Sequence, residues 1–409
     1  MTICKKMGAA VACLVSFGLS ANVAANEGHS IASVAQALET SGGLTWYLQA
    51  TDGAEDNTSA LSYTLDLALE AELGDHGEVY VVFEAGDGQG VDPVIGALSG
   101  VNYDAFFTEL TNNVEGSTNI IALSISQAYY EIEGFMMDDL TISAGKLDIH
   151  SYFDDNNYAN DETDQFMSPM FTRSADTTYK QLDYYYAPGI IGQYAMSKEV
   201  GLTFIVANAN ASGFNDVTKN LYYVGQLNLM PSFWNYEGNY RFYALSDQRD
   251  SAFPTDTSHP ASGGVITSFT AISSGNKTTN SAWGMSFDQA VPGQIGLFAR
   301  YSAQEAGIIE NTVKSSWSFG GVISGDRWGH THDTAGIAYG SVNVNRETAV
   351  LSDAGIVNPA DEKHTEIFYK RGFSHLFSLT ANLQIINNIG GEADANTVLV
   401  YGMRGQLNF

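Results

Sequence analysis

Apolar and polar residues alternate along several segments of this chain, and this alternation limits what the chain can fold into. In the segment 61–73, LSYTLDLALEAEL, the odd positions are apolar and most even positions are polar or acidic. The segments 221–229, 234–244, 295–301 and 378–386 repeat the pattern. Successive side chains of a strand point to opposite faces, so each segment predicts a strand with one apolar face and one polar face.

The length of these segments favours a membrane barrel over a soluble sandwich. Most of them run to about nine to thirteen residues, which is the length that a tilted strand needs to cross a bilayer. Strands of soluble proteins typically have about five or six residues. A soluble antiparallel sandwich shows the same alternation and is the weaker alternative.

The segment 398–409 ends the chain on such a strand. Its odd positions are mostly apolar and end on Phe409, whereas its even positions include Arg404, Gln406 and Asn408. We expect this strand to close a barrel, with its apolar face toward lipid and its polar face toward the lumen, because a closed barrel pairs every backbone group. The terminal Phe409 resembles the C-terminal assembly signal of bacterial outer-membrane proteins, so the barrel assembly machinery is an expected partner.

Residues 1–25 have the features of a secretory signal peptide. Two lysines precede an apolar run over 7–21, and small residues at 23–25 offer a cleavage site. Both cysteines, Cys4 and Cys13, lie inside this segment, so the exported chain is expected to have no disulfide. No other stretch has the length and composition of a transmembrane helix. These features predict export to the bacterial outer membrane.

The rest of the chain is expected to form a short linker and one domain. Residues 26–42 are predicted as a short N-terminal periplasmic helix or linker, because Ile31, Val34 and Leu38 share one face of a helix. Residues 43–409 are predicted as one transmembrane antiparallel β-barrel domain of the all-β class. Its connections alternate between tight and long, as they do in outer-membrane barrels: 74–77 is tight, and 86–119, 245–280 and 351–363 are long.

The charge balance narrows the choice of partners. The formal net charge is −28, and removing Lys5 and Lys6 with the signal peptide leaves about −30. Nucleic acid is therefore not an expected partner. A pore for phosphate-like anions would need a ladder of basic residues, and Lys and Arg number only 18.

The polar stretch 145–171, GKLDIHSYFDDNNYANDETDQFMSPMF, resembles the carbohydrate-selective porin (OprB-like) family. The matching residues are Gly145, Lys146, Asp148, Phe153, Asp154, Asn156, Ala159, Asn160, Asp161, Glu162, Gln165, Phe166 and Phe171. The segments 298–301 and 383–409 also resemble the family. The chain departs from the family pattern at 388–389, where a proline is usual, and at 149–150, and both departures bear on the sugar preference.

The resemblance implies a barrel of about sixteen strands that lets small hydrophilic solutes diffuse passively, with carbohydrates preferred. A pore selects by diameter, hydrogen-bonding groups and field. Sugars need aromatic faces for stacking and charged or amide groups for their hydroxyls. The candidate pore-lining and substrate-binding residues are Lys146, Asp148, Tyr152, Phe153, Asp154 and Arg173 in the motif, and Glu70, Glu237, Arg241, Phe298, Arg300 and Arg404 on lumen parity. The alternative is that these are interior salt bridges that keep the barrel rigid.

No catalytic, cofactor or metal site is expected. The eight histidines are scattered, and no Ser–His pair stands in a recognisable setting. The acidic run from Asp154 lacks the ligand spacing and the glycine of an EF-hand loop. The chain is therefore not expected to be an enzyme.

Two rival functions remain open at this point. One is a general or cation-preferring porin of the same fold, and the other is a non-conducting surface adhesin or structural barrel. The expected surroundings are outer-membrane lipid and lipopolysaccharide, with sugars as the transported solutes. A homo-oligomer is left open, because no interface signal separates a monomer from a trimer.

Overall fold

The computed structural model describes residues 38–73, 76–104, 122–174, 186–208, 217–219, 221–233, 235–248, 279–305 and 311–409. The predicted signal peptide and most of the predicted N-terminal helix lie outside these residues.

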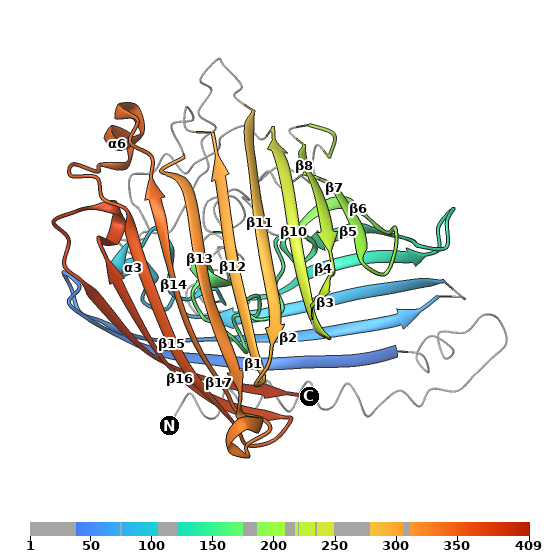
Figure 1. The fold of residues 1–409 in the computed structure, drawn as a ribbon, viewed down its shortest axis with the longest axis horizontal. Helices are drawn as coiled ribbons and strands as arrows, with labels where there is room; N and C mark the ends of the chain where they lie inside the picture. Colours follow the sequence, from blue (N-terminus) through green and yellow to red (C-terminus); the bar gives the residue numbers. More distant parts are fainter. Residues whose placement is uncertain are drawn as a thin grey trace.

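The described strands form one closed antiparallel sheet (Figure 1). Apart from the short β9, each strand pairs with the strands before and after it in the chain, and β1 pairs with both β2 and β17, which closes the ring. Of the seventeen strands, the two-residue β9 pairs only with the start of β10, so sixteen strands make up the barrel. The prediction of a sixteen-stranded barrel is confirmed.

The strands are β1 (Leu38–Asp52), β2 (Ser59–Glu72), β3 (Gly77–Asp87), β4 (Ala122–Glu133), β5 (Leu140–Asp148), β6 (Tyr186–Ala195), β7 (Val200–Ala207), β8 (Tyr222–Leu229), β9 (Ser232–Phe233), β10 (Tyr236–Asp247), β11 (Asn280–Val291), β12 (Ile295–Gln304), β13 (Val313–Ser324), β14 (Thr334–Val344), β15 (Glu362–Gly372), β16 (Phe377–Asn387) and β17 (Val398–Asn408). The helices are short: α3 (Asp92–Ile95), η1 (Ile149–Tyr152), α5 (Pro169–Thr172), η3 (Gly325–Trp328), α6 (Thr348–Ala354) and η4 (Ile389–Gly391). No helix among the described residues is both long and apolar enough to cross a membrane.

The two faces of the sheet follow the alternation of the sequence. On β17, the outward side chain of Tyr401 is 49% exposed, whereas the inward Val400 is 0% exposed. The large apolar residues that are exposed, such as Phe204, Phe319 and Ile337, stand on the outer parity of their strands. Closure leaves no free sheet edge, which a lipid environment requires.

The start of the barrel differs from the prediction. We expected a helix or linker up to residue 42, but Leu38–Thr40 already belong to β1 and pair with Leu69–Ala71 of β2. The apolar residues are spaced as in a helix, but this segment pairs with β2, because intrinsic helix propensity is weaker than the tertiary hydrogen bonds of a sheet. Residues 26–37, where the rest of that helix would lie, are outside the described residues.

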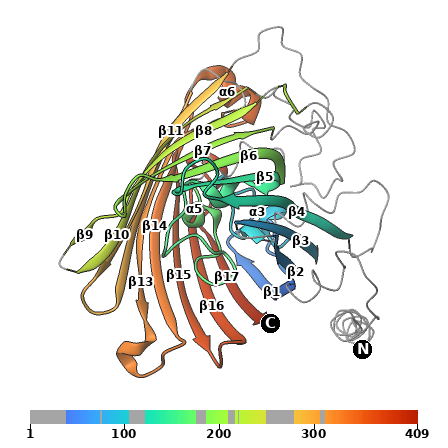
Figure 2. The same cartoon turned by 90° about the vertical axis from the view of Figure 1, so that its right-hand side faces the viewer.

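The connections separate the two ends of the barrel. Tight turns join β11 to β12 and β15 to β16, whereas long connections follow β3, β5 and β10. In outer-membrane barrels the short turns are on the periplasmic side. Two of the long connections fold back into the barrel, where α3 and α5 lie inside the ring of strands (Figure 2). We call residues 149–174 the inward loop and residues 88–104 the second inward segment.

Candidate functional site

The inward loop begins where Asp148 ends β5. One carboxylate oxygen of Asp148 accepts a hydrogen bond from the backbone N–H of His150 at 3.0 Å, and the other accepts one from the hydroxyl of Ser151 at 2.5 Å. This N-cap starts η1 and turns the chain toward the lumen. Asp148, which we predicted in the pore lining, therefore also shapes the loop.

The first aromatic residue of the loop is part of an apolar core. Phe153 is 0% exposed and packs in a cluster with Ile149, with wall residues of β6–β8, and with Tyr243 of β10. Its ring meets that of Tyr243 edge-on, with centroids 5.4 Å apart. A ring that is covered in this way cannot stack on a solute.

A second apolar cluster fixes the far end of the loop. Phe166 and Phe171 pack against Phe298 of β12 and Phe368 of β15. Phe298 is 4% exposed, although it stands on lumen parity. This part of the barrel interior is therefore an apolar core between the loop and the wall. Phe298 supports the loop and does not face the pore.

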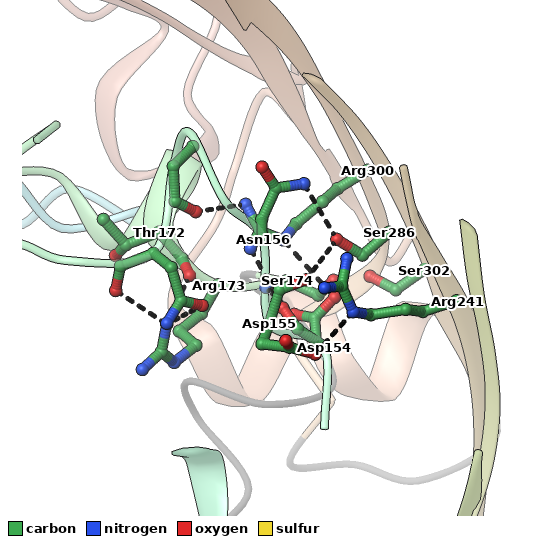
Figure 3. A network of polar contacts seen from close by, with 12 residues as sticks. Asp154, Asp155, Asn156, Thr172, Arg173, Ser174, Arg241, Ser286, Arg300 and Ser302 are labelled. Carbon is green, nitrogen blue, oxygen red and sulfur yellow. Dashed lines mark hydrogen bonds and ion pairs between the residues drawn. The ribbon is translucent and has the colours of Figure 1, made fainter. Parts of the chain in front are cut away.

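Arg300 of β12 holds the loop through its backbone (Figure 3). The guanidinium donates to the carbonyl oxygens of Ala159 at 2.7 Å, Asp154 at 2.9 Å and Phe171. Its Nε also lies 3.4 Å from Oδ1 of Asp154. The planar fork of an arginine suits several acceptors at once, so a single wall residue joins three points of the loop.

Arg241 of β10 makes a similar attachment nearby (Figure 3). Its Nε lies 2.7 Å from Asp155 of the loop, and its NH1 lies 2.7 Å from Asp288 of β11. Asn156, the next residue of the loop, donates to Ser286 of β11 at 3.1 Å. The start of the loop is therefore fixed to β10, β11 and β12.

The opposite wall holds the tip and the end of the loop. Arg404 of β17 donates to the carbonyl oxygens of Glu162 at 2.6 Å and Gln165 at 3.0 Å. Glu366 of β15 accepts from the backbone N–H groups of Met167 at 2.7 Å and Ser168 at 3.1 Å. The loop thus spans the lumen from β10 to β17.

Arg173 belongs to the loop itself and connects the end of the loop to Asn160 near its middle. Its guanidinium donates to the backbone and side-chain oxygens of Asn160 at 2.9 and 2.6 Å. The same group lies 5.8 Å from the ring centre of Tyr103 in the second inward segment. Arg173 therefore joins the two segments that fold into the lumen.

The second inward segment rests on β15, β16, β1 and β2. Glu362 of β15 accepts from the backbone N–H groups of Leu98 and Ser99, both at 2.8 Å. At its inner end the carboxylate of Asp104 accepts from the hydroxyl of Thr64 on β2 at 2.6 Å. Together the two segments line β1 and most of the wall from β6 to β17. On the remaining wall, formed by β2–β5, they contact Thr64, Tyr129 and Leu147.

Acidic residues gather on that remaining wall. Asp66 of β2 and Glu84 of β3 are opposite each other in the sheet, and both interact electrostatically with Asp104. Burial inside the barrel raises the pKa of the Asp104 carboxyl to about 6 and that of the Glu162 carboxyl, at the tip of the inward loop, to about 8. Asp66, Asp148 and Glu162 are half-buried and so remain in reach of a small solute.

The other predicted site residues are spread over the barrel. Leu147 of β5 is buried in the Phe153 cluster, so the adjacent Lys146 lies on the opposite face of the strand. Its Nζ donates to the carbonyl oxygen of Ile125 at 2.6 Å. Glu70 lies on the lumen face of β2, and Glu237 is exposed near the β9–β10 hairpin. Tyr152 is half-buried in η1 and packs beside Phe153.

Several residues of the site are not predicted from the sequence. Glu366, Glu362 and Tyr103 are among them, because their roles depend on where the two inward segments lie in the folded barrel. Asp66 and Glu84 carry a usable signal, because each is an acidic residue on the lumen parity of a predicted strand.

A closed sixteen-stranded barrel with an apolar outer face, a polar interior and loops folded into its lumen is a porin, a diffusion channel of the bacterial outer membrane. Residues 50–409 match the model of the carbohydrate-selective porin, OprB family, so the chain belongs to that family. The resemblance of the segment 145–171 to this family is therefore confirmed.

Solved structures of porins share the fold. A high-pH structure of Pseudomonas putida OprB is 16% identical, with 91% of this chain and 94% of that chain covered and a TM-score of 0.71. A low-pH structure of Pseudomonas putida OprB is 12% identical, with 91% and 93% covered and a TM-score of 0.54. Pseudomonas aeruginosa OccK11 (OpdR) is 8% identical, with 91% and 96% covered and a TM-score of 0.50. No curated protein sequence matches the chain.

Proposed function

We propose that small sugars diffuse through this porin between the inward loop and the wall of β2–β5. The observation that carries the proposal is the attachment of the inward loop to both sides of the barrel, by Arg241 and Arg300 at one side and by Arg404 and Glu366 at the other. A loop that is fixed in this way narrows the lumen permanently. A narrow polar passage favours neutral solutes rich in hydroxyl groups over bulky or apolar ones.

The polar groups along this passage suit sugar hydroxyls. Asp66, Asp148 and Glu162 offer carboxylates that are half-buried, and Tyr152 offers a phenol ring and a hydroxyl. Arg173 interacts electrostatically with Asp148 and Glu162 and brings one positive charge among them. Groups of opposite sign across a narrow passage orient water and hydroxyl dipoles, so these residues form the proposed constriction.

Solute flux into liposomes that contain the purified protein tests the proposal. Glucose is compared with a disaccharide and with an uncharged non-sugar solute of matched size. Faster glucose entry that saturates with concentration is the expected result. Entry that depends on size alone would reduce the protein to a general porin, and no entry would favour the non-conducting adhesin.

A cation-preferring general porin is the second candidate. The acidic residues Asp66, Glu84, Asp104 and Glu162 favour it, because they outnumber the basic residues that interact with them, which are Lys146, Arg173 and Arg404. Reversal potentials in a salt gradient separate the two functions: a strong preference for cations without faster sugar entry would support the second candidate.

The proposal extends to the absence of enzymatic activity, to the contacts of the outer face and to the oligomeric state. We infer from the porin family that the chain is a channel and not an enzyme. The outer parity of the strands is proposed to contact lipid and lipopolysaccharide, and Phe409 is proposed to engage the barrel assembly machinery. Cross-linking in native membranes tests whether the barrel is a monomer or a homo-oligomer.

A further inference from the structure

Two tyrosines stack on the lumen face of the β2–β5 wall. Tyr80 of β3 and Tyr129 of β4 are paired in register, and their ring centres are 4.8 Å apart with an angle of 16° between the ring planes. Tyr80 shares its parity with Glu84, which interacts with Asp104 of the second inward segment, so this parity faces the lumen. Both rings are half-buried. The pair therefore presents aromatic surface inside the barrel.

The neighbours of the pair cover the two rings in part. Tyr129 packs against the edge of the Phe153 cluster, and its hydroxyl is hydrogen-bonded to that of Tyr152 in η1. The residue that pairs with Tyr129 on β5 is Gly145, which places no side chain beside that ring. Its φ of +146° favours glycine, and a Cβ there would lie 2.4 Å from the carbonyl oxygen of Ala128. At the other side of the pair, Glu70 of β2 pairs with Tyr80.

Hydrogen-bond acceptors stand one step further toward the short-turn end. Glu78 and Glu131 pair with each other in the next lumen-facing row. The hydroxyl of Tyr80 donates to Glu78, and the hydroxyl of Ser143 donates to Glu131 at 2.6 Å. Each carboxylate has further lone pairs for other donors. Aromatic faces and carboxylates thus meet on one patch of the wall.

We propose that Tyr80 and Tyr129, with Glu70, Glu78 and Glu131, form a sugar-binding subsite on the periplasmic side of the constriction. The ligand class is a neutral pyranose, whose C–H face covers a tyrosine ring and whose hydroxyls donate to the carboxylates. This subsite deepens the proposed function and rests on it. It would hold a sugar that has passed the inward loop and is about to leave the barrel.

Sugar block of the ion current through single channels in a planar bilayer tests the subsite, with glucose and maltose as probes. In the variant Tyr80→Leu/Tyr129→Leu, which keeps apolar volume but loses the rings, the half-blocking sugar concentration should rise about tenfold. The variant Tyr80→Phe/Tyr129→Phe keeps the rings and should stay within about threefold of the wild type. Tyr130→Leu is the matched control, because Tyr130 stands on the outer face of β4 and should leave the block unchanged.

The outcomes separate the subsite from the function it rests on. Sugar block in the wild type that persists unchanged in the folded Leu variant would overturn the subsite and leave the proposed function intact. Absence of any sugar block in the conducting wild type would overturn both. Heat-modifiable gel mobility confirms that each variant forms the barrel, and if the double Leu variant does not fold, Tyr129→Leu alone is tested against the same expectation.

Discussion

Arg300 and Asp154 form an ion pair that is sealed inside the barrel: Nε of Arg300 lies 3.4 Å from Oδ1 of Asp154, and the two side chains are 1% and 0% exposed. The arginine also donates to three carbonyl oxygens of the inward loop, including that of Asp154. Arg300 therefore joins β12 to the loop in two ways, by hydrogen bonds to the loop backbone and by an ion pair with a loop carboxylate. The position of the loop should depend strongly on Arg300.

The first prediction concerns this pair. Arg300→Met should lower the stability of the folded barrel by about 3–5 kcal/mol, because it removes the cation that faces the buried Asp154 and the donor to three carbonyl oxygens of the loop. Asp154 keeps the hydrogen bond from the N–H of Ser174 at 2.7 Å. The matched control is Arg346→Met, since Arg346 and Asp361 pair at 3.1 Å on the surface with 56% and 38% exposure and such pairs contribute about 0–1 kcal/mol. Urea unfolding in detergent micelles measures both. Equal losses in the two variants would show that Arg300 does not anchor the loop.

The second prediction concerns pH. Burial raises the pKa of Asp104 to about 6 and that of Glu162 to about 8, so both carboxyls are neutral in acid and gain negative charge as the pH rises through these values. The preference of the pore for cations should therefore increase between about pH 5 and pH 9.

Reversal potentials across that range measure the effect. The substitution Glu162→Gln should remove the upper part of the rise, and Asp104→Asn the lower part. A preference for cations that falls with rising pH, or one that both variants leave unaltered, would contradict the assignment of these two groups to the passage.

The third prediction concerns the contact between Tyr158 of the inward loop and β12. A Cβ on Gly296 would lie 2.3 Å from the ring of Tyr158, so Gly296→Ala must displace that ring and should cost about 1–3 kcal/mol. A cavity of about 470 Å³ adjoins both residues and gives the ring a place to move to. Gly192→Ala is the control, because nothing lies within 4 Å of its Cβ position. Comparable stability of the two variants in urea would mean that Tyr158 does not pack tightly against β12.

The fourth prediction concerns the carboxylate that binds the end of the loop. Glu366→Ala removes the acceptor of the N–H groups of Met167 and Ser168 and of the Asn382 amide at 2.6 Å, and should destabilise the barrel by about 2–4 kcal/mol. Glu392 accepts from two N–H groups in an exposed connection, so Glu392→Ala should cost less than about 1 kcal/mol. The same unfolding assay applies, and a larger loss at Glu392 would refute the ranking.

The sequence predicts the barrel well because each strand carries its own evidence. The alternation in 61–73 and 398–409 places lipid-facing and lumen-facing residues correctly, and Arg241, Arg300 and Arg404 do point inward. What the sequence cannot provide is the wall on which a loop comes to rest. The contact of Arg404 with Glu162 joins residues 242 positions apart and exists only after the barrel has closed.

The position of the inward loop also explains the roles of Phe153 and Phe298. On an open lumen wall an aromatic residue of inward parity would meet water and solutes. Once the inward loop covers the wall, both rings become core, at 0% and 4% exposure. The stretch 145–171 is distinctive in the sequence, but its phenylalanines stabilise the loop, whereas Tyr152, Tyr80 and Tyr129 are half-buried.

The measurement that tests the account most directly asks whether sugars pass while the inward loop stays attached. The protein has no cysteine after Cys13, so the pair Asn156→Cys and Ser286→Cys can be introduced where the two side chains meet at 3.1 Å, and oxidised to tie the loop to β11. Glucose flux into liposomes is then compared before and after reduction of the same sample. The account predicts equal, saturable flux in both states, whereas flux that appears only after reduction would show that the loop must leave the wall for sugars to pass.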